Sequence, residues 1–349
     1  MIEKLVRKNI LRLSPYTSAR DSFLEGILLD ANENSLGSVV ADKTNLQLNR
    51  YPDPSQNKIR EKLGKYLGVE KDKLFLGVGS DEIIDLLIRI FCNPGKDSVL
   101  ITEPTYGMYK VTCGVNDVKI LSVPLNRKFQ INVESTLGEV QKNTKIIFLC
   151  SPNNPTGNLL SKKGVLKVVK SFKGIVVIDE AYIDFANDYS FIDEIKNYKN
   201  LVILRTFSKA WGLAGVRCGY SIADEFITNL LFKIKAPYNL SKLTTNAILE
   251  ALSNIKKKDN FVKKLNKEKE KLVKELKNIK QVKKILPSDA NFILFKINNA
   301  TIIYNQLAKE GVIIRDRSNQ LNLENCLRVS VGTPRENRKF IKVLCEILS

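Results

Sequence analysis

The sequence contains no histidine, and this absence excludes more function classes than any other feature of its composition. A Ser-His-Asp triad, a Cys-His pair and a metal site with an imidazole ligand all require histidine, so one chain can build none of them. Catalysis by this chain must therefore use lysine, aspartate, tyrosine or serine side chains, or a bound cofactor.

Long apolar runs and paired cysteine motifs are also missing. No continuous apolar stretch approaches the roughly 18 residues that cross a bilayer, and residues 1–13 lack the apolar core of a signal peptide. The six cysteines never occur as C-x-x-C, which argues against a zinc site or a disulfide framework and favours reduced thiols. We therefore expect a cytoplasmic protein that binds no metal and no membrane.

Acidic residues are scarce relative to basic ones, with 37 Asp and Glu against 56 Lys and Arg, and the net charge is +19. Such an excess can indicate nucleic-acid binding. However, lysines occur along the whole chain, and their densest run, residues 256–284, has apolar residues on one face and no alternating aromatic residues. We interpret this run as a long amphipathic linking helix. We expect no nucleic acid as a partner and expect the charge to attract small anionic substrates.

The length of 349 residues predicts two domains. Short runs rich in valine, isoleucine and leucine alternate with helical stretches, which predicts an α/β fold with a mostly parallel sheet covered by helices on both faces. The predicted strands are residues 74–78, 98–102, 119–123, 146–150, 175–178, 201–204 and 218–222. A smaller α+β set follows, with strands at 291–296, 311–315 and 326–330 and helices at 302–309 and 334–348.

These patterns predict three parts of the chain. Residues 1–45 form an N-terminal arm that also contributes to the small domain, residues 46–255 form the large domain, and residues 256–349 form the small C-terminal domain.

Polar groups follow the predicted parallel strands, where ligands of such sheets bind. The segment Gly77-Val-Gly-Ser-Asp81 opens a helix whose free N–H groups could hold a phosphate, although Ser80 and Asp81 could instead cap that helix. Later strands are followed by an aromatic residue, an amide, an acid with a phenol, and a lysine: Tyr106, Asn154, Asp179 with Tyr182, and Lys209.

Pyridoxal 5′-phosphate is the cofactor that this set of groups suits. A lysine can bond its carbonyl carbon, and a carboxylate can keep its pyridine nitrogen protonated so that the ring withdraws electrons. An aromatic side chain can stack on the ring, while serine, arginine and backbone N–H groups can hold the phosphate.

Four strings carry a resemblance to a known family: Ser151-Pro-Asn-Asn-Pro-Thr-Gly157, Asp179-Glu-Ala-Tyr182, Ser208-Lys-Ala210 and Gly215-Val-Arg-Cys-Gly219. In this order and spacing they resemble the fold-type-I pyridoxal-phosphate-dependent aminotransferases. Within that group the chain is similar to the histidinol-phosphate aminotransferases, over nearly its whole length. The resemblance implies a homodimer in histidine biosynthesis that converts L-histidinol phosphate and 2-oxoglutarate to 3-(imidazol-4-yl)-2-oxopropyl phosphate and L-glutamate.

The resemblance also implies roles for residues around the cofactor. Lys209 would form the Schiff base and carry the proton, and Asp179 would pair with the pyridine nitrogen. Asn154 and Tyr182 would bond the ring oxygen O3′, with Tyr106 stacked on the ring. The cofactor phosphate would be surrounded by Ser80, Asp81, Ser208, Arg217 and, from the neighbouring subunit, Tyr51.

For the substrates, the resemblance implies a cationic pocket containing Arg315 and Arg328, with Tyr16 and Asn32 from the arm. Surface salt bridges remain an alternative for the arginines, as does a surface turn for Tyr51. One departure lies beside the lysine, where Trp211 and Gly212 replace the usual phenylalanine and alanine.

Other activities of the same scaffold stay open, because relatives share much of it. The alternatives are an aminotransferase for aromatic amino acids and a threonine-phosphate decarboxylase.

Overall fold

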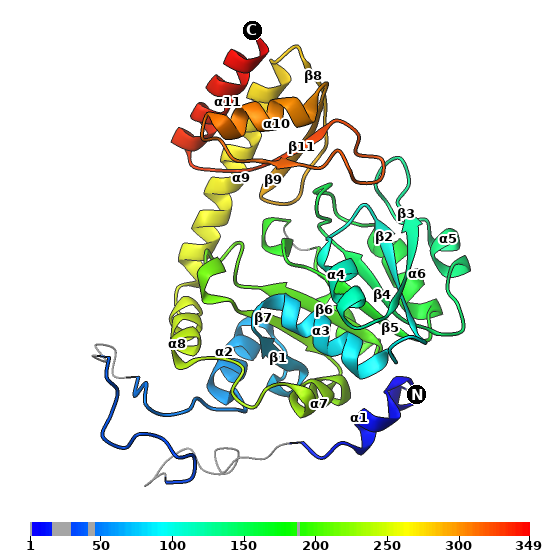
Figure 1. Ribbon diagram of the computed structural model, residues 1–349, viewed down its shortest axis with the longest axis vertical. Coiled ribbons are helices and arrows are strands. Elements are labelled where there is room, and N and C mark those ends of the chain that lie inside the picture. Colours follow the sequence, from blue (N-terminus) through cyan, green and yellow to red (C-terminus); the bar gives the residue numbers. More distant parts are fainter. Residues whose placement is uncertain (1, 16–28, 41–45, 187–188) are drawn as a thin grey trace.

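Two β-sheets organise the computed structural model, which describes residues 2–15, 29–40, 46–186 and 189–349 (Figure 1). A seven-stranded sheet has the order β1-β7-β6-β5-β4-β2-β3, and a four-stranded sheet has the order β10-β11-β9-β8. The predicted α/β class, with a large parallel-sheet domain and a smaller α+β domain, is confirmed.

The seven-stranded sheet is parallel except for β7, which pairs antiparallel with both β6 and β1. Its strands are fully buried at the centre, as their near-continuous aliphatic sequence predicts. They are β1 (Leu74–Gly77), β2 (Ser98–Glu103), β3 (Lys119–Pro124), β4 (Thr144–Cys150), β5 (Ile175–Asp179), β6 (Leu201–Thr206) and β7 (Gly219–Ala223).

Helices cover both faces of this sheet. Successive residues of each strand point to opposite faces, so each strand contributes to two cores. Ile147 and Leu149 pack into one core, and Ile146 and Phe148 into the other. The first core includes α2 (Asn57–Leu67), α6 (Lys162–Ser171) and α8 (Lys242–Ala251). The second includes α3 (Gly79–Phe91), α4 (Met108–Val115) and α7 (Glu225–Ile234).

The four-stranded sheet is antiparallel throughout and packs on three helices in the upper part of Figure 1. Its strands are β8 (Val282–Ile285), β9 (Phe292–Ile297), β10 (Arg315–Asp316) and β11 (Cys326–Ser330). The helices are α9 (Ile255–Lys277), α10 (Ala300–Lys309) and α11 (Pro334–Leu348). From β11, an interior strand of this sheet, the Arg328 side chain donates a hydrogen bond to Asn154 of the large domain.

Two predicted elements need correction. The linking helix does not extend over residues 256–284: α9 ends at Lys277, and β8 pairs with β9 as an edge strand whose lysines face solvent. The predicted strand over residues 311–315 is reduced to β10, because Gly311 turns the chain with a φ of +71° after α10.

The described start of the chain packs on the large sheet. Ile2 and Val6 are buried in the core that contains α3 and α7, and the Arg7 N–H donates to the Ile90 carbonyl at 3.0 Å. The contribution of residues 1–45 to the small domain stays a prediction. Among the described residues no helix is both long and apolar enough to cross a membrane.

Candidate active site

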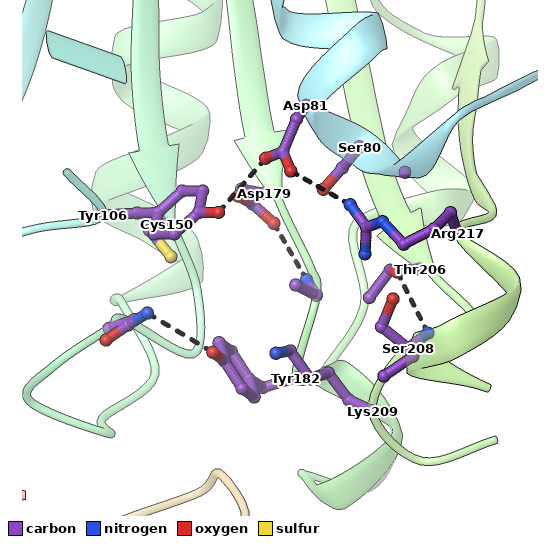
Figure 2. Close-up of a pocket in the computed structure, with 14 residues that line it drawn as sticks. Ser80, Asp81, Tyr106, Cys150, Asp179, Tyr182, Thr206, Ser208, Lys209 and Arg217 are labelled. Atoms are coloured by element: carbon purple, nitrogen blue, oxygen red, sulfur yellow. Dashed lines mark hydrogen bonds and ion pairs between the residues drawn. The ribbon is translucent and has the colours of Figure 1, made fainter. Parts of the chain in front are cut away.

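A cavity of about 580 Å³ lies at the carboxyl ends of the parallel strands (Figure 2). The side chains that line it come from five connections after strands of the large sheet, as the topology of an open parallel sheet requires. Most of the predicted cofactor-binding residues meet here: Ser80, Asp81, Tyr106, Asn154, Asp179, Tyr182, Ser208, Lys209 and Arg217.

Lys209 follows β6 and points into the cavity beside Tyr182, with its Nζ 5.6 Å from the centre of the Tyr182 ring. Phe207 and Trp211 are buried on either side of it and hold this segment against the core. Burial lowers the pKa of the Lys209 ammonium, and the charge of Arg328 lowers it further. The amine is therefore more easily deprotonated than an ordinary lysine, which a nucleophile and proton carrier needs.

Asp179 ends β5 at the floor of the cavity and is 2% exposed. Its carboxylate accepts hydrogen bonds from the Tyr109 hydroxyl at 2.8 Å and from the Ala181 N–H at 3.0 Å. Burial raises its pKa to about 6, although both hydrogen bonds act in the opposite direction. A buried carboxylate is suited to pair with a cationic ring nitrogen, because the positive charge would favour the ionised form of the carboxylate.

Asn154 and Tyr182 meet on one side of the cavity. The side-chain amide nitrogen of Asn154 donates to the Tyr182 hydroxyl at 3.3 Å. The Arg328 guanidinium donates to the side-chain oxygen Oδ1 of Asn154 at 2.5 Å. Asn154 lies in the loop after β4, between cis peptide bonds at Ser151–Pro152 and Asn154–Pro155. Through these contacts a residue of the small sheet reaches the large-sheet site.

The opposite side of the cavity is built on the turn from β1 into α3. Asp81 accepts a hydrogen bond from the Tyr106 hydroxyl at 3.1 Å and lies 3.4 Å from the Arg217 guanidinium. Helix α3 begins at Gly79 and has no side-chain cap, so the alternative that Ser80 and Asp81 cap it is wrong. The first N–H groups of α3, with Ser208 and Arg217, form a donor set that suits a phosphate.

The other predicted residues lie elsewhere. Arg315 is exposed and faces Arg328 across the β10–β11 pair. Asn32 and Tyr51 line a separate cavity. The Tyr51 ring stacks on the Tyr238 ring, with ring centroids 4.4 Å apart. Tyr16 lies outside the described residues.

Several residues of the site were not predicted from the sequence. Thr206 accepts a hydrogen bond from the Ser208 N–H at 3.1 Å, and Cys150 lines the cavity. Tyr109, which was not singled out from the sequence, bonds Asp179 and stacks on Phe148. One signal could have indicated Tyr109. A buried carboxylate needs a hydrogen-bond donor, and a phenol hydroxyl can supply one.

Taken together, the lining residues fit pyridoxal 5′-phosphate. An amine, a buried carboxylate and an amide–phenol pair surround one part of the cavity, and a helix start with an arginine forms the other. Space at the helix start depends on Gly79, since a Cβ there would come within 2.7 Å of the Arg217 guanidinium. Because glycine has no side chain, the backbone at Gly79 leaves room beside Arg217 for a bound phosphate.

Comparisons with known proteins point the same way. The family model described as aminotransferase class I and II matches residues 25–344. Histidinol-phosphate aminotransferase of Cytophaga hutchinsonii is 48% identical over 345 residues, which are 98% of each chain. The crystal structure of the histidinol-phosphate aminotransferase from Clostridium acetobutylicum has a TM-score of 0.79 at 28% identity and covers 86% of this chain and 91% of that one.

A third comparison bears on the fold. Histidinol-phosphate aminotransferase from Sinorhizobium meliloti, solved in complex with pyridoxal 5′-phosphate, has a TM-score of 0.79 at 21% identity and covers 91% of this chain and 90% of that one. With a matching family model over most of its length and relatives of this similarity, the chain belongs to the class I and II aminotransferases, among the histidinol-phosphate aminotransferases.

Proposed function

We propose that the chain transfers the amino group of L-histidinol phosphate to 2-oxoglutarate, giving 3-(imidazol-4-yl)-2-oxopropyl phosphate and L-glutamate, as a step of histidine biosynthesis. The observation that carries this proposal is that Lys209 and Asp179 line one cavity with Asn154, which accepts a hydrogen bond from the small-sheet Arg328. The similarity to relatives named for this activity supports the same substrate.

Pyridoxal 5′-phosphate, when bound, supplies an electron-withdrawing ring that stabilises negative charge on the substrate carbon from which a proton is removed. Asp179 would hold the proton of the ring nitrogen, and Asn154 and Tyr182 would donate to the ring oxygen. Tyr106 would cover one face of the ring. Ser80, Asp81, Ser208 and Arg217 would surround the phosphate and fix the position of the ring.

Lys209 would bond the cofactor when no substrate is present and would then serve as the base for the substrate proton. Its lowered pKa supports this role, because a base works best when its pKa is near the working pH. The buried side chains of Phe207 and Trp211 fix the position of the segment that carries this amine.

Arg315 and Arg328, with Asn32 and Tyr16, would bind the anionic groups of the two substrates in turn. The rigid fork of an arginine pairs with phosphate and carboxylate alike, so one pocket can accept both. Tyr51 would reach the phosphate site of a second copy of the chain in a homodimer. Tyr51 is not among the residues that line the active-site cavity of its own chain, and 48% of it is exposed, which is consistent with that arrangement.

The visible absorption spectrum of the cofactor-loaded protein tests the proposal. Adding L-histidinol phosphate without 2-oxoglutarate should bleach the band of the lysine-bound cofactor at stoichiometric donor, and later addition of 2-oxoglutarate should restore it. A band that persists with this donor but bleaches with tyrosine or phenylalanine would move the assignment to an aromatic amino acid aminotransferase. Release of carbon dioxide from threonine phosphate would favour the decarboxylase.

A further inference from the structure

Three arginines share one face of the β10–β11 ribbon. Arg315 lies directly opposite Arg328 in the antiparallel register. The pairing continues one step further, because the Arg317 N–H donates to the Cys326 carbonyl at 2.9 Å. Residues two apart on a strand point to the same side, so Arg317 lies on the face that carries Arg315 and Arg328.

This arrangement is unfavourable without an anion. Like charges directly opposite each other destabilise a strand pair. Among the described residues, none of the three guanidinium groups has a carboxylate within ion-pair distance. The nearest acid in sequence, Asp316, accepts hydrogen bonds from the Thr301 hydroxyl at 2.6 Å and from the Ser318 N–H at 2.8 Å.

Buried donors in this group also lack partners. The Nε atoms of Arg317 and Arg328 are buried and find no hydrogen-bond partner in the part of the chain that the structure describes, although an unpaired buried donor costs free energy. Both guanidinium charges act on Tyr182, a lining residue of the cavity, where they oppose the rise that burial causes in its pKa. Burial and the charges of Arg328 and Arg315 lower the pKa of Arg317 to about 10.

We propose that Arg317 binds the phosphate group of the amino donor together with Arg315 and Arg328, and that it makes the enzyme prefer phosphorylated over unphosphorylated donors. This inference rests on the proposed function, because it concerns the donor of that reaction. A phosphate dianion offers several acceptor oxygens and more charge than one carboxylate, so it can satisfy donors from more than one arginine. The unpaired Nε of Arg317 supplies such a donor.

The test compares Arg317→Gln with Arg335→Gln, the same change at an exposed arginine at the start of α11 in the same small domain. In the half-reaction of the cofactor-loaded protein, R317Q should raise the half-saturating concentration of L-histidinol phosphate about 10- to 100-fold, the scale of one lost hydrogen bond to a charged group. Its half-saturation by L-histidinol, which lacks the phosphate, and its maximal rate should change little. R335Q should match the wild type with both donors.

A second readout does not depend on turnover. Inorganic phosphate, titrated into the cofactor-loaded protein by calorimetry, should bind more weakly to R317Q than to the wild type or R335Q. Arg317→Lys should lose less than R317Q, because lysine keeps the charge but not the fork, and this variant serves if R317Q fails to fold. An equal loss for both donors, or unchanged phosphate binding in R317Q, would overturn the inference.

Failure of the proposed function would look different. In that case the wild-type band would persist with L-histidinol phosphate. Selective loss of phosphate affinity in R317Q would still support the arginine site.

Discussion

The carboxylate of Asp179 illustrates how a single residue can serve function at a cost to stability. It is buried at the end of β5, and its pKa of about 6 exceeds the ordinary value of 3.8. The folded chain therefore holds this proton more tightly than the unfolded chain does. The stability of the cofactor-free protein should fall as the pH rises from about 4 to 6, and the loss should persist at higher pH.

We expect Asp179→Asn to remove this loss. The cofactor-free variant should be more stable than the wild type by about 1–3 kcal/mol near pH 7, because an amide carries no charge to bury. It should also lose transaminase activity, since an amide cannot hold the ring nitrogen in its protonated form. Urea unfolding of both proteins at pH 5 and pH 7, with exposed Asp193→Asn as the control, measures the effect. A stability gap that does not grow with pH would contradict this account.

Lys209 provides the second prediction at the residue scale. Lys209→Ala should lower transamination by at least about a thousandfold, the scale expected when a covalent nucleophile that also transfers protons is removed. The fold should persist, because within the described part of the chain the Lys209 amine makes no hydrogen bond or ion pair that the substitution would remove. Stopped-flow absorption with the donor, alongside the exposed Lys167→Ala, is the measurement. Near-normal turnover in the variant would remove Lys209 from the mechanism.

At the scale of the elements, the turn from β1 into α3 depends on a glycine. Gly79 has a φ of +74°, and a Cβ there would approach the Arg217 guanidinium to 2.7 Å. Gly68, which ends α2, has a φ of +70° but nothing within 4 Å of a Cβ. Both positions have a backbone conformation that disfavours an L side chain. They differ in what an added methyl group would touch.

Gly79→Ala and Gly68→Ala should each destabilise the fold by about 1 kcal/mol, because an L side chain disfavours this backbone conformation. Only Gly79→Ala should also displace Arg217 and weaken cofactor binding, by about tenfold if one charge-assisted hydrogen bond is lost. Titration of the cofactor-free variants with pyridoxal 5′-phosphate, followed by absorption, separates the two effects. Equal cofactor affinity in both variants would show that the contact with Arg217 is unimportant.

Helix α9 connects the small sheet to the loops of the site. Near its start, Lys258 lies 3.2 Å from Asp184, which follows Tyr182 in the chain, and 5.3 Å from the centre of the Trp211 ring. The Trp211 ring also packs edge-on against Tyr66. These contacts give the unusual tryptophan beside Lys209 a defined place, which the sequence pattern alone could not supply.

At the scale of the whole molecule, Tyr51 does not line the active-site cavity of its own chain but lines a separate cavity. If Tyr51 completes the site of a second copy, Tyr51→Ala and Lys209→Ala should each be inactive alone and should complement each other in mixed dimers. Each mixed dimer has one intact site of two, so purified mixed dimers should show about half of the wild-type activity. Steady-state assays of tandem-tagged, purified mixed dimers test this, and no recovery would exclude a shared site.

Much of the architecture was readable from local sequence. Aliphatic strands such as Ile175–Asp179 predicted a buried parallel sheet, because only strands covered on both faces lack polar alternation. The end of α9 was not readable, since Val282 and Ile285 fit an amphipathic helix as well as an edge strand. Pairing with β9 decided between them. The predicted boundaries near residues 45 and 255 remain predictions.

The sequence by itself determined which chemistry was possible. The lack of histidine and the order of the motifs around Asp179 and Lys209 favoured pyridoxal phosphate, because local strings carry residue type and spacing. Only the tertiary structure decided which groups share an environment. It buried Asp179 beside Tyr109, brought Arg328 to Asn154 and set Arg317 beside Arg315 and Arg328. These contacts join residues far apart in the chain, and burial and electrostatic interaction act through space, not along the sequence.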